Sequence, residues 1–206
     1  NLISNFVKAK GNQISFGLFM KGGGSGGRIE RNLVICTPQN ISQRGSRVGL
    51  SFGGGETGNA YCRNQRCDFE HTAGMAANNI VAHCNDFGID VNRSSAILIA
   101  HNTLINTAGI DVRGNSKAVR VYANLLDGRI RQRDGSEMSI DMNEVVTMGD
   151  MFTRPDALQL EWLNLPANIP SLTTVAKDFC GQVRTDGTLP GALTDKTDCL
   201  AQHARP

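Results

Sequence analysis

The sequence predicts an all-β fold, a solenoid in which parallel strands stack coil upon coil. The main observation is a threefold repeat over residues 75–130, headed by Asn79, Asn102 and Asn124, which recur about 22 residues apart. Each copy contains short β-branched runs without helical periodicity, which indicates strands. Glycine is frequent, at 23 residues, whereas aromatic residues make up 5% of the chain. Glycine and asparagine at corners, with small aliphatic residues inside, are typical of stacked coils.

The length of 206 residues fits one domain with its own core. We assign the repeat coils to residues 1–148 and an irregular cap with a tail to residues 149–206, where the period is lost. The cap is expected to cover the last coil, with Trp162 packed against it, because an open end exposes strand edges. Residues 1–5 already resemble a strand and a corner, so we expect N-terminal coils to be missing.

The coils follow one another in order along the chain. The first two occupy residues 5–21 and 28–52, and the second carries a polar insertion at 37–47. An irregular segment at 56–72 precedes the clear repeats, and long loops in compact domains are often functional. A weaker coil at 139–146 follows the repeats.

Side-chain alternation within the strands gives each coil a core side and an outward side. In the strand at residues 88–92, Ile89 and Val91 point inward, whereas Asp90 and Asn92 point outward. The same rule predicts one outward face whose polar side chains lie about 4.8 Å apart from coil to coil. This face contains Lys21, Ser51, Asp90, Asn92, Asp111 and Arg113, and it is extended by Arg93, Arg131 and Arg133. The asparagines that head the repeats are expected to form a separate corner ladder of amide hydrogen bonds.

Six cysteines are placed where disulfides can close loops. The candidate pairs are Cys62 with Cys67 around a polar loop, Cys180 with Cys199 around a Gly/Pro/Thr-rich tail, and Cys36 with Cys84 in neighbouring coils. The last two cysteines are either buried thiols or a third pair. An even number of cysteines with two natural loop closures indicates a secreted or periplasmic protein.

Charge and hydropathy argue against two kinds of partner. The formal net charge is +2, which gives no basis for bulk nucleic-acid binding. No apolar run approaches the roughly 20 residues of a membrane span. We therefore expect neither nucleic acid nor a membrane span.

The outward face suits an extended acidic polysaccharide or oligosaccharide. Its cations can pair with uronic carboxylates, and arginine does so with two parallel hydrogen bonds. We assign substrate binding to Lys21, Asp90, Asn92, Asp111, Arg131 and Arg133.

The repeats resemble those of right-handed parallel β-helix proteins, and more narrowly those of the alginate lyase and chondroitinase B family of polysaccharide lyases. The family carries Asn-Lys-Ser, Asn-Thr-Phe and Arg-His-Gly-Asn motifs. The matching positions are Asn92-Arg93-Ser94, Asn102-Thr103-Leu104 and Arg113-Gly114-Asn115. The resemblance implies β-elimination on a uronic-acid-containing polymer, with Arg93 at the position of the base and Arg113 assisting.

The resemblance also implies calcium, which neutralises the substrate carboxylate. Asp86 matches one acidic position of the family, and Asp90 or Asp111 are the further candidate ligands. Hard carboxylate oxygens are the ligands that calcium prefers.

β-Elimination needs a cation that stabilises the enolate, a base for the C5 proton and an acid for the leaving oxygen. We assign the first role to Arg113. The base is Arg93 or His71, whose loop is expected to fold over the face.

Two alternatives remain open. One is a glycoside hydrolase in which Asp90 and Asp111 form the acid pair. The other is a non-catalytic glycan-binding solenoid, because Arg93 stands where the family has a lysine base.

Overall fold

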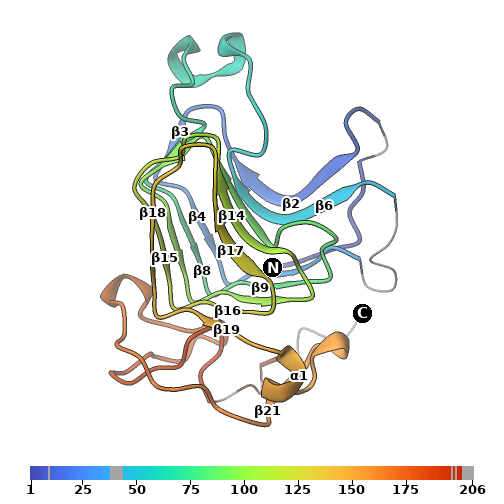
Figure 1. Ribbon diagram of the computed structural model, residues 1–206, viewed down its shortest axis with the longest axis vertical. Helices are drawn as coiled ribbons and strands as arrows, with labels where there is room; N and C mark the ends of the chain where they lie inside the picture. Colours follow the sequence, from blue (N-terminus) through green and yellow to red (C-terminus); the bar gives the residue numbers. More distant parts are fainter. Residues whose placement is uncertain (9, 38–43, 196, 198, 201–206) are drawn as a thin grey trace.

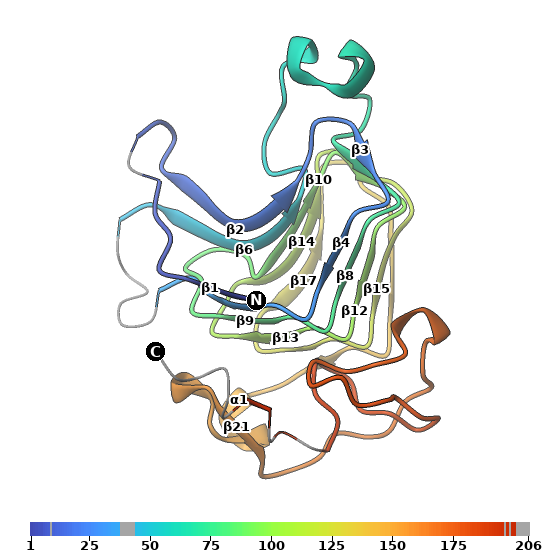
Figure 2. The same cartoon turned by 180° about the vertical axis from the view of Figure 1, so that it is seen from behind.

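The computed structural model describes residues 1–8, 10–37, 44–195, 197, 199 and 200. Within these residues the predicted all-β class is confirmed, and nearly all strands belong to four parallel sheets around a common interior (Figures 1 and 2). The described helices are short: α1 (Met148–Met151) and the 3-10 helices η1 (Asn59–Tyr61), η2 (Arg63–Gln65), η3 (Pro155–Ala157) and η4 (Thr173–Val175). Most of the expected polar insertion, residues 38–43, lies outside the described residues.

Each parallel sheet takes one strand from successive passes of the chain. Sheet A contains β1 (Leu2–Ser4), β5 (Leu33–Ile35), β9 (Ile80–Ala82), β13 (Thr103–Ile105), β16 (Leu125–Leu126) and β19 (Glu144–Val145). Sheet B contains β2 (Ile14–Met20), β6 (Ser46–Phe52), β10 (Ile89–Asn92), β14 (Gly109–Arg113) and β17 (Arg129–Gln132). Sheet C contains β3 (Gly24–Ser25), β7 (His71–Thr72) and β11 (Ser94–Ser95). Sheet D contains β4 (Arg28–Glu30), β8 (Met75–Ala77), β12 (Leu98–Ala100), β15 (Val119–Tyr122) and β18 (Met138–Asp141).

The strand registers follow the sequence repeat. Thr103 in β13 pairs with Ile80 in β9 on one side and with Leu125 in β16 on the other. In sheet B, Ile89 pairs with Ile110 in the same parallel manner. Because neighbouring strands come from equivalent positions of successive repeats, the arrangement is compatible with a parallel β-helix.

The inward side chains predicted by alternation form the main core. In β6, β10 and β14 they are fully buried, and they comprise Leu50, Phe52, Ile89, Val91, Ile110 and Val112. Leu18 and Met20 of β2 are partly buried and pack against the same cluster. Removing such apolar surface from water contributes about 25 cal/mol per Å². The core therefore fixes which side chains of sheet B face outward.

The predicted asparagine ladder is present at the turns between sheets D and A. Nδ2 of Asn79 donates to Oδ1 of Asn102, and Nδ2 of Asn102 donates to Oδ1 of Asn124, both at 2.9 Å. The backbone N–H groups of Asn79 and Asn102 donate to the same acceptors. Asn32 and Asn143 continue the ladder at its two ends. The buried amides thus satisfy the polar groups of each turn.

Three disulfides join the cysteines, so both loop closures predicted from the sequence are confirmed. The pairs are Cys36–Cys84, Cys62–Cys67 and Cys180–Cys199. The first, which the sequence left open, joins the ends of β5 and β9 in adjacent coils. Such a set of bridges is typical of proteins outside the cytosol.

Residues 148–195 lie along the outer side of sheet A rather than over the end of the stack (Figures 1 and 2). β20 (Phe152–Arg154) and β21 (Gln159–Trp162) pair in antiparallel fashion. The apolar side chains of this segment pack on outward residues of sheet A, namely Leu33, Ile80, Ile105 and Leu125. The segment therefore buries a face of the sheet.

The expected cap over the last coil is wrong in its placement. Ile140 of β18 and Val145 of β19 remain 52% and 60% exposed. The Trp162 ring packs on Phe152, with 4.3 Å between the ring centroids, and its Nε1 donates to the carbonyl oxygen of Thr194. The reason is the row of apolar outward residues in sheet A, which offers this segment a surface to bury. No helix in the described part of the chain has the length and apolarity needed to cross a membrane.

Candidate functional site

The outer face of sheet B gathers most of the predicted site residues into two columns. Each strand contributes one side chain to a column, because the strands pair in register. The first column contains Phe19, Ser51, Asp90, Asp111 and Arg131. The second contains Asn92 and Arg113, and Arg133 follows β17.

Asp90 is fully buried although its side chain points away from the core. Nε of Arg113 donates to Oδ1 of Asp90 at 2.8 Å, and the Ser51 hydroxyl donates to Oδ2 at 3.1 Å. Burial raises the pKa of Asp90, while the hydrogen bonds from Arg113 and Ser51 favour its ionised form. Burial lowers the pKa of Arg113, but the hydrogen bonds with Asp90 and the negative charges of Asp90 and Asp111 together outweigh it, so the pKa of Arg113 is raised. Arg113 is therefore a firmly held cation.

Asp111 repeats this arrangement one strand further along. Nε and Nη2 of Arg133 donate to its two oxygens at 3.0 and 2.8 Å, and these bonds raise the pKa of Arg133. Nε of Arg131 lies 3.8 Å from Oδ1 of Asp111, and its guanidinium stacks over the ring of Phe87, 4.7 Å from the centroid. Each buried carboxylate thus fixes a guanidinium group contributed by the next coil.

The arginines keep donors for a ligand. The side chains of Arg113 and Arg133 are 30% and 46% exposed. Their Nη1 atoms have no hydrogen-bond partner within the described residues. Because the aspartates lie beneath, the surface of β14 and β17 presents guanidinium groups to solvent.

A cavity of about 390 Å³ opens beside Arg113. Four predicted site residues help to line it: Asp86, Asn92, Arg93 and Arg113. Nη1 of Arg93 donates to Glu56 at 2.8 Å, and Nη2 donates to the Cys67 carbonyl oxygen at 3.1 Å. Arg93 therefore ties the loop at residues 53–70 to the end of β10. Nothing in the sequence relates Glu56 to Arg93, so this contact was not predicted.

Gly114 follows β14, at the position where the lyase family has a histidine. Its φ is +65°, and a Cβ at this position would overlap with Oδ1 of Asn92. A side chain at this position would therefore be strained and would displace the Asn92 amide.

A second cavity, of about 600 Å³, adjoins the first at the β2 end of the sheet. The two cavities adjoin, and we term them together the sheet B groove; their shared lining residues are Asn12, Ile14, Phe16, Gly54, Gly55 and Glu56. Lys21 and Phe19 line its second cavity. β2 and β6 run on past the other strands of the sheet (Figure 1), and Ile14 and Phe16 of β2 line both cavities. Phe19 is not among the predicted site residues, although the alternation of side chains along β2 also points it outward.

His71 does not lie on this face. It belongs to β7, is 3% exposed, and its ring packs on Phe52 with 5.1 Å between centroids. Its Nε2 accepts a hydrogen bond from the backbone N–H of Gly27, and burial lowers the pKa of His71. The expectation that His71 reaches the face is wrong, because pairing with β3 and β11 draws His71 to the inside, although Glu56 of the same loop lines the groove.

The described side chains do not fit the expected calcium ion. No group of three His, Cys, Asp or Glu side chains within the described residues is arranged to hold a metal. The carboxylates of Asp90 and Asp111 already accept hydrogen bonds from arginines, and Asp86 accepts one from the backbone N–H of Phe87. The guanidinium groups of Arg113 and Arg133 neutralise Asp90 and Asp111 in place of a metal ion, so we derive no step through calcium.

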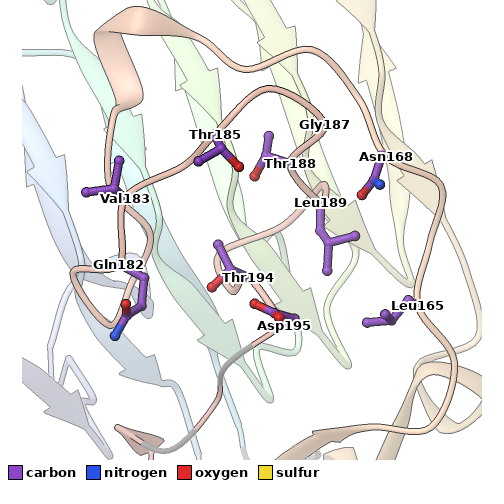
Figure 3. Close-up of a pocket in the computed structure, with 10 residues that line it drawn as sticks. All are labelled: Leu165, Asn168, Gln182, Val183, Thr185, Gly187, Thr188, Leu189, Thr194 and Asp195. Carbon is purple, nitrogen blue, oxygen red and sulfur yellow. The ribbon is translucent and has the colours of Figure 1, made fainter.

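A further cavity of about 390 Å³ lies in the C-terminal segment (Figure 3). Ten residues line it, among them Asn168, Gln182, Thr194 and Asp195. None of the predicted site residues lines this cavity. It therefore lies apart from the sheet B groove.

No protein-family model, curated protein or solved structure matches the chain. The functional interpretation therefore rests on the side chains of the groove.

Proposed function

We propose that the chain is a right-handed parallel β-helix protein that acts outside the cytosol and binds a uronic-acid-containing polysaccharide in the sheet B groove. The observation that carries this proposal is the paired arrangement of Asp90 with Arg113 and Asp111 with Arg133. Arginines that are pre-oriented by buried carboxylates bind further carboxylates at a small cost in side-chain entropy. Strands about 4.8 Å apart present these cations as a row along a polymer.

A second candidate function is β-elimination, in the manner of the polysaccharide lyases that the repeats resemble. It is favoured by the position of Arg93 and Arg113, which line the same cavity. Arg113 would neutralise the substrate carboxylate and stabilise the enolate. Arg93 donates hydrogen bonds to Glu56 and to a carbonyl oxygen, as a protonated guanidinium does. That geometry favours polysaccharide binding over abstraction of the C5 proton by Arg93.

The glycoside hydrolase alternative receives no support from the geometry. A hydrolase acid must reach the glycosidic oxygen. Asp90 and Asp111 are fully buried, and each one accepts hydrogen bonds from an arginine that separates it from the groove.

The three functions are separated by incubating the protein with polygalacturonate, alginate and chondroitin sulfate. Retention on the immobilised polymer without new products is the expected result. Absorbance of unsaturated uronides would establish a lyase, whereas new reducing ends without that absorbance would establish a hydrolase. Failure to bind any of these polymers would contradict the proposal.

Arg113→Ala tests the residue that carries the proposal. We expect it to weaken polymer binding about 10- to 100-fold, because it removes charge-assisted hydrogen bonds worth roughly 1.5–3 kcal/mol. The matched control is Arg28→Ala in β4 of sheet D, since Arg28 is also paired with a carboxylate, that of Glu30 at 2.7 Å. Equal affinities of the Arg113→Ala and wild-type proteins would show that the cation is not part of the site.

A further inference from the structure

We infer that the sheet B groove contains a second saccharide subsite, formed by Phe19 and Lys21 at the β2 end. This inference rests on the proposed function and adds the length and chemistry of the bound chain. The ligand is an acidic oligosaccharide long enough to reach from Arg113 to β2, with one sugar ring resting on Phe19.

The strand registers place the two subsites on one line. Phe19 stands in the same outward column as Asp90, two strands away, with Ser51 between them. Two strand spacings correspond to about 10 Å. Lys21 follows Met20, which pairs with Phe52, so Lys21 continues the column that contains Asn92 and Arg113. A chain that runs across the strands therefore meets both subsites.

Small residues lie between the two subsites. The two cavities share the six lining residues that define the groove. Gly53 stands in the second column between Lys21 and Asn92, and its φ is +111°. A Cβ at Gly53 would overlap with the Asn92 carbonyl oxygen. Ser51 in the first column is small, so the centre of the face carries little side-chain bulk.

Phe19 has the properties of a stacking platform. Its side chain is 53% exposed, and Phe16 supports it edge-on, with 6.0 Å between the ring centroids. Large apolar side chains at the surface of a polar groove mark ligand contacts. Sugar rings have an apolar C–H face that packs on aromatic rings, while their carboxylates remain at the edge.

Lys21 supplies the charge that a uronate residue needs at this end. It is half-buried, it lines the 600 Å³ cavity, and no ion pair engages it within the described residues. Glu56, the nearest acid in the lining, is paired with Arg93. The aromatic ring and the ammonium group together fit one uronic residue, with its face on Phe19 and its carboxylate toward Lys21.

Calorimetric titration with disaccharides and octasaccharides of galacturonate, mannuronate and chondroitin tests the inference. A disaccharide reaches one subsite, whereas an octasaccharide reaches both. We expect Phe19→Ala to weaken octasaccharide binding about tenfold, in line with the apolar area that the ring buries. Disaccharide binding at the arginines should be unchanged. Phe19→Tyr keeps the ring and should restore affinity, and Leu163→Ala removes an equally exposed apolar side chain from the C-terminal segment as a control.

Each outcome has a separate meaning. If the wild-type protein binds none of these saccharides, the proposed function fails and the second subsite fails with it. If it binds the octasaccharide and Phe19→Ala binds it equally well, the second subsite is wrong while the proposed function stands. If Phe19→Ala loses disaccharide and octasaccharide affinity to the same extent, Phe19 belongs to the arginine subsite, and the two-subsite inference is overturned.

Discussion

Two buried aspartates change the chemical character of the outer face of sheet B. Side-chain alternation predicts that Asp90 and Asp111 point outward, and an acidic, metal-binding surface follows from that prediction. In the structure, arginines from the next coil lie over both carboxylates. The surface that meets solvent is therefore formed by guanidinium groups. Leaving either buried carboxylate without its arginine would cost several kcal/mol, so each pair is a fixed unit.

His101 predicts how stability depends on pH. It is fully buried, and burial together with the positive charge of Arg184 lowers its pKa from 6.5 to about 3. Below pH 6.5 the unfolded chain takes up a proton at His101, whereas the folded protein does so only near pH 3. The free energy of unfolding is therefore not reduced by His101 above pH 6.5. As the pH falls from 6.5 to 3, protonation of His101 in the unfolded chain lowers this free energy by up to about 5 kcal/mol.

The measurement is the free energy of unfolding in urea between pH 7 and pH 4. His101→Gln, which does not titrate, should show a shallower decline than the wild-type protein. His71 remains in both proteins, so its own lowered pKa cancels in the comparison. Parallel declines in the two proteins would show that His101 is not responsible.

The asparagine ladder fixes the turn that separates sheet D from sheet A in successive coils. Asn102 illustrates its density of contacts, because Oδ1 accepts two hydrogen bonds from Asn79 and Nδ2 donates to Asn124 and to two carbonyl groups. The residue that precedes each ladder asparagine has a positive φ, as Asn78 and His101 do. The side chain thus supplies the hydrogen bonds that a bent backbone cannot make for itself.

Asn102→Ala should lower the free energy of unfolding by about 3 kcal/mol, because it leaves buried donors and acceptors without partners. Asn143→Ala, at the half-buried end of the ladder, should cost about 1 kcal/mol, since water replaces the lost amide there. Equilibrium urea denaturation compares the two variants. A larger loss for Asn143→Ala than for Asn102→Ala would contradict this account of the ladder.

The disulfides contribute to the whole molecule according to the length of chain that they close. Cys36–Cys84 spans 48 residues and Cys62–Cys67 spans 5. Replacing both cysteines of the first pair by alanine should cost about 4 kcal/mol, and the same change in the second pair about 2 kcal/mol. Thermal unfolding under non-reducing conditions provides the measurement. Equal losses would show that loop length does not govern these bridges.

The sequence was sufficient for the features that repeat. The spacing of the asparagines predicts stacked parallel strands, and side-chain alternation predicts that Ile89, Val91, Ile110 and Val112 lie in the core. The interlocking of Asp90 with Arg113 was not predictable from alternation, because it depends on which way an arginine one coil away extends its side chain.

Two other features depend on contacts between distant segments. His71 belongs to the irregular segment at residues 56–72, but strand pairing carries it inside. The C-terminal segment packs beside sheet A because apolar residues such as Leu33 and Ile80 face outward there. The position of His71 has no signal in the local sequence, because strand pairing decides it. The burial of sheet A does have one, since Leu33-Val34-Ile35 and Ile80-Val81-Ala82 are continuous apolar runs, which are typical of strands covered on both faces.

The packing of the C-terminal segment against sheet A also bears on how the protein unfolds. In a stack of coils that touch only their neighbours, the ends fray and melting spreads coil by coil. Here a single segment shares one apolar cluster with Leu33, Ile80, Ile105 and Leu125, which belong to four successive strands of sheet A. If one of these coils loosens, the C-terminal segment loses packing contacts that also stabilise the other three coils. We therefore expect the described coils to unfold in one cooperative transition.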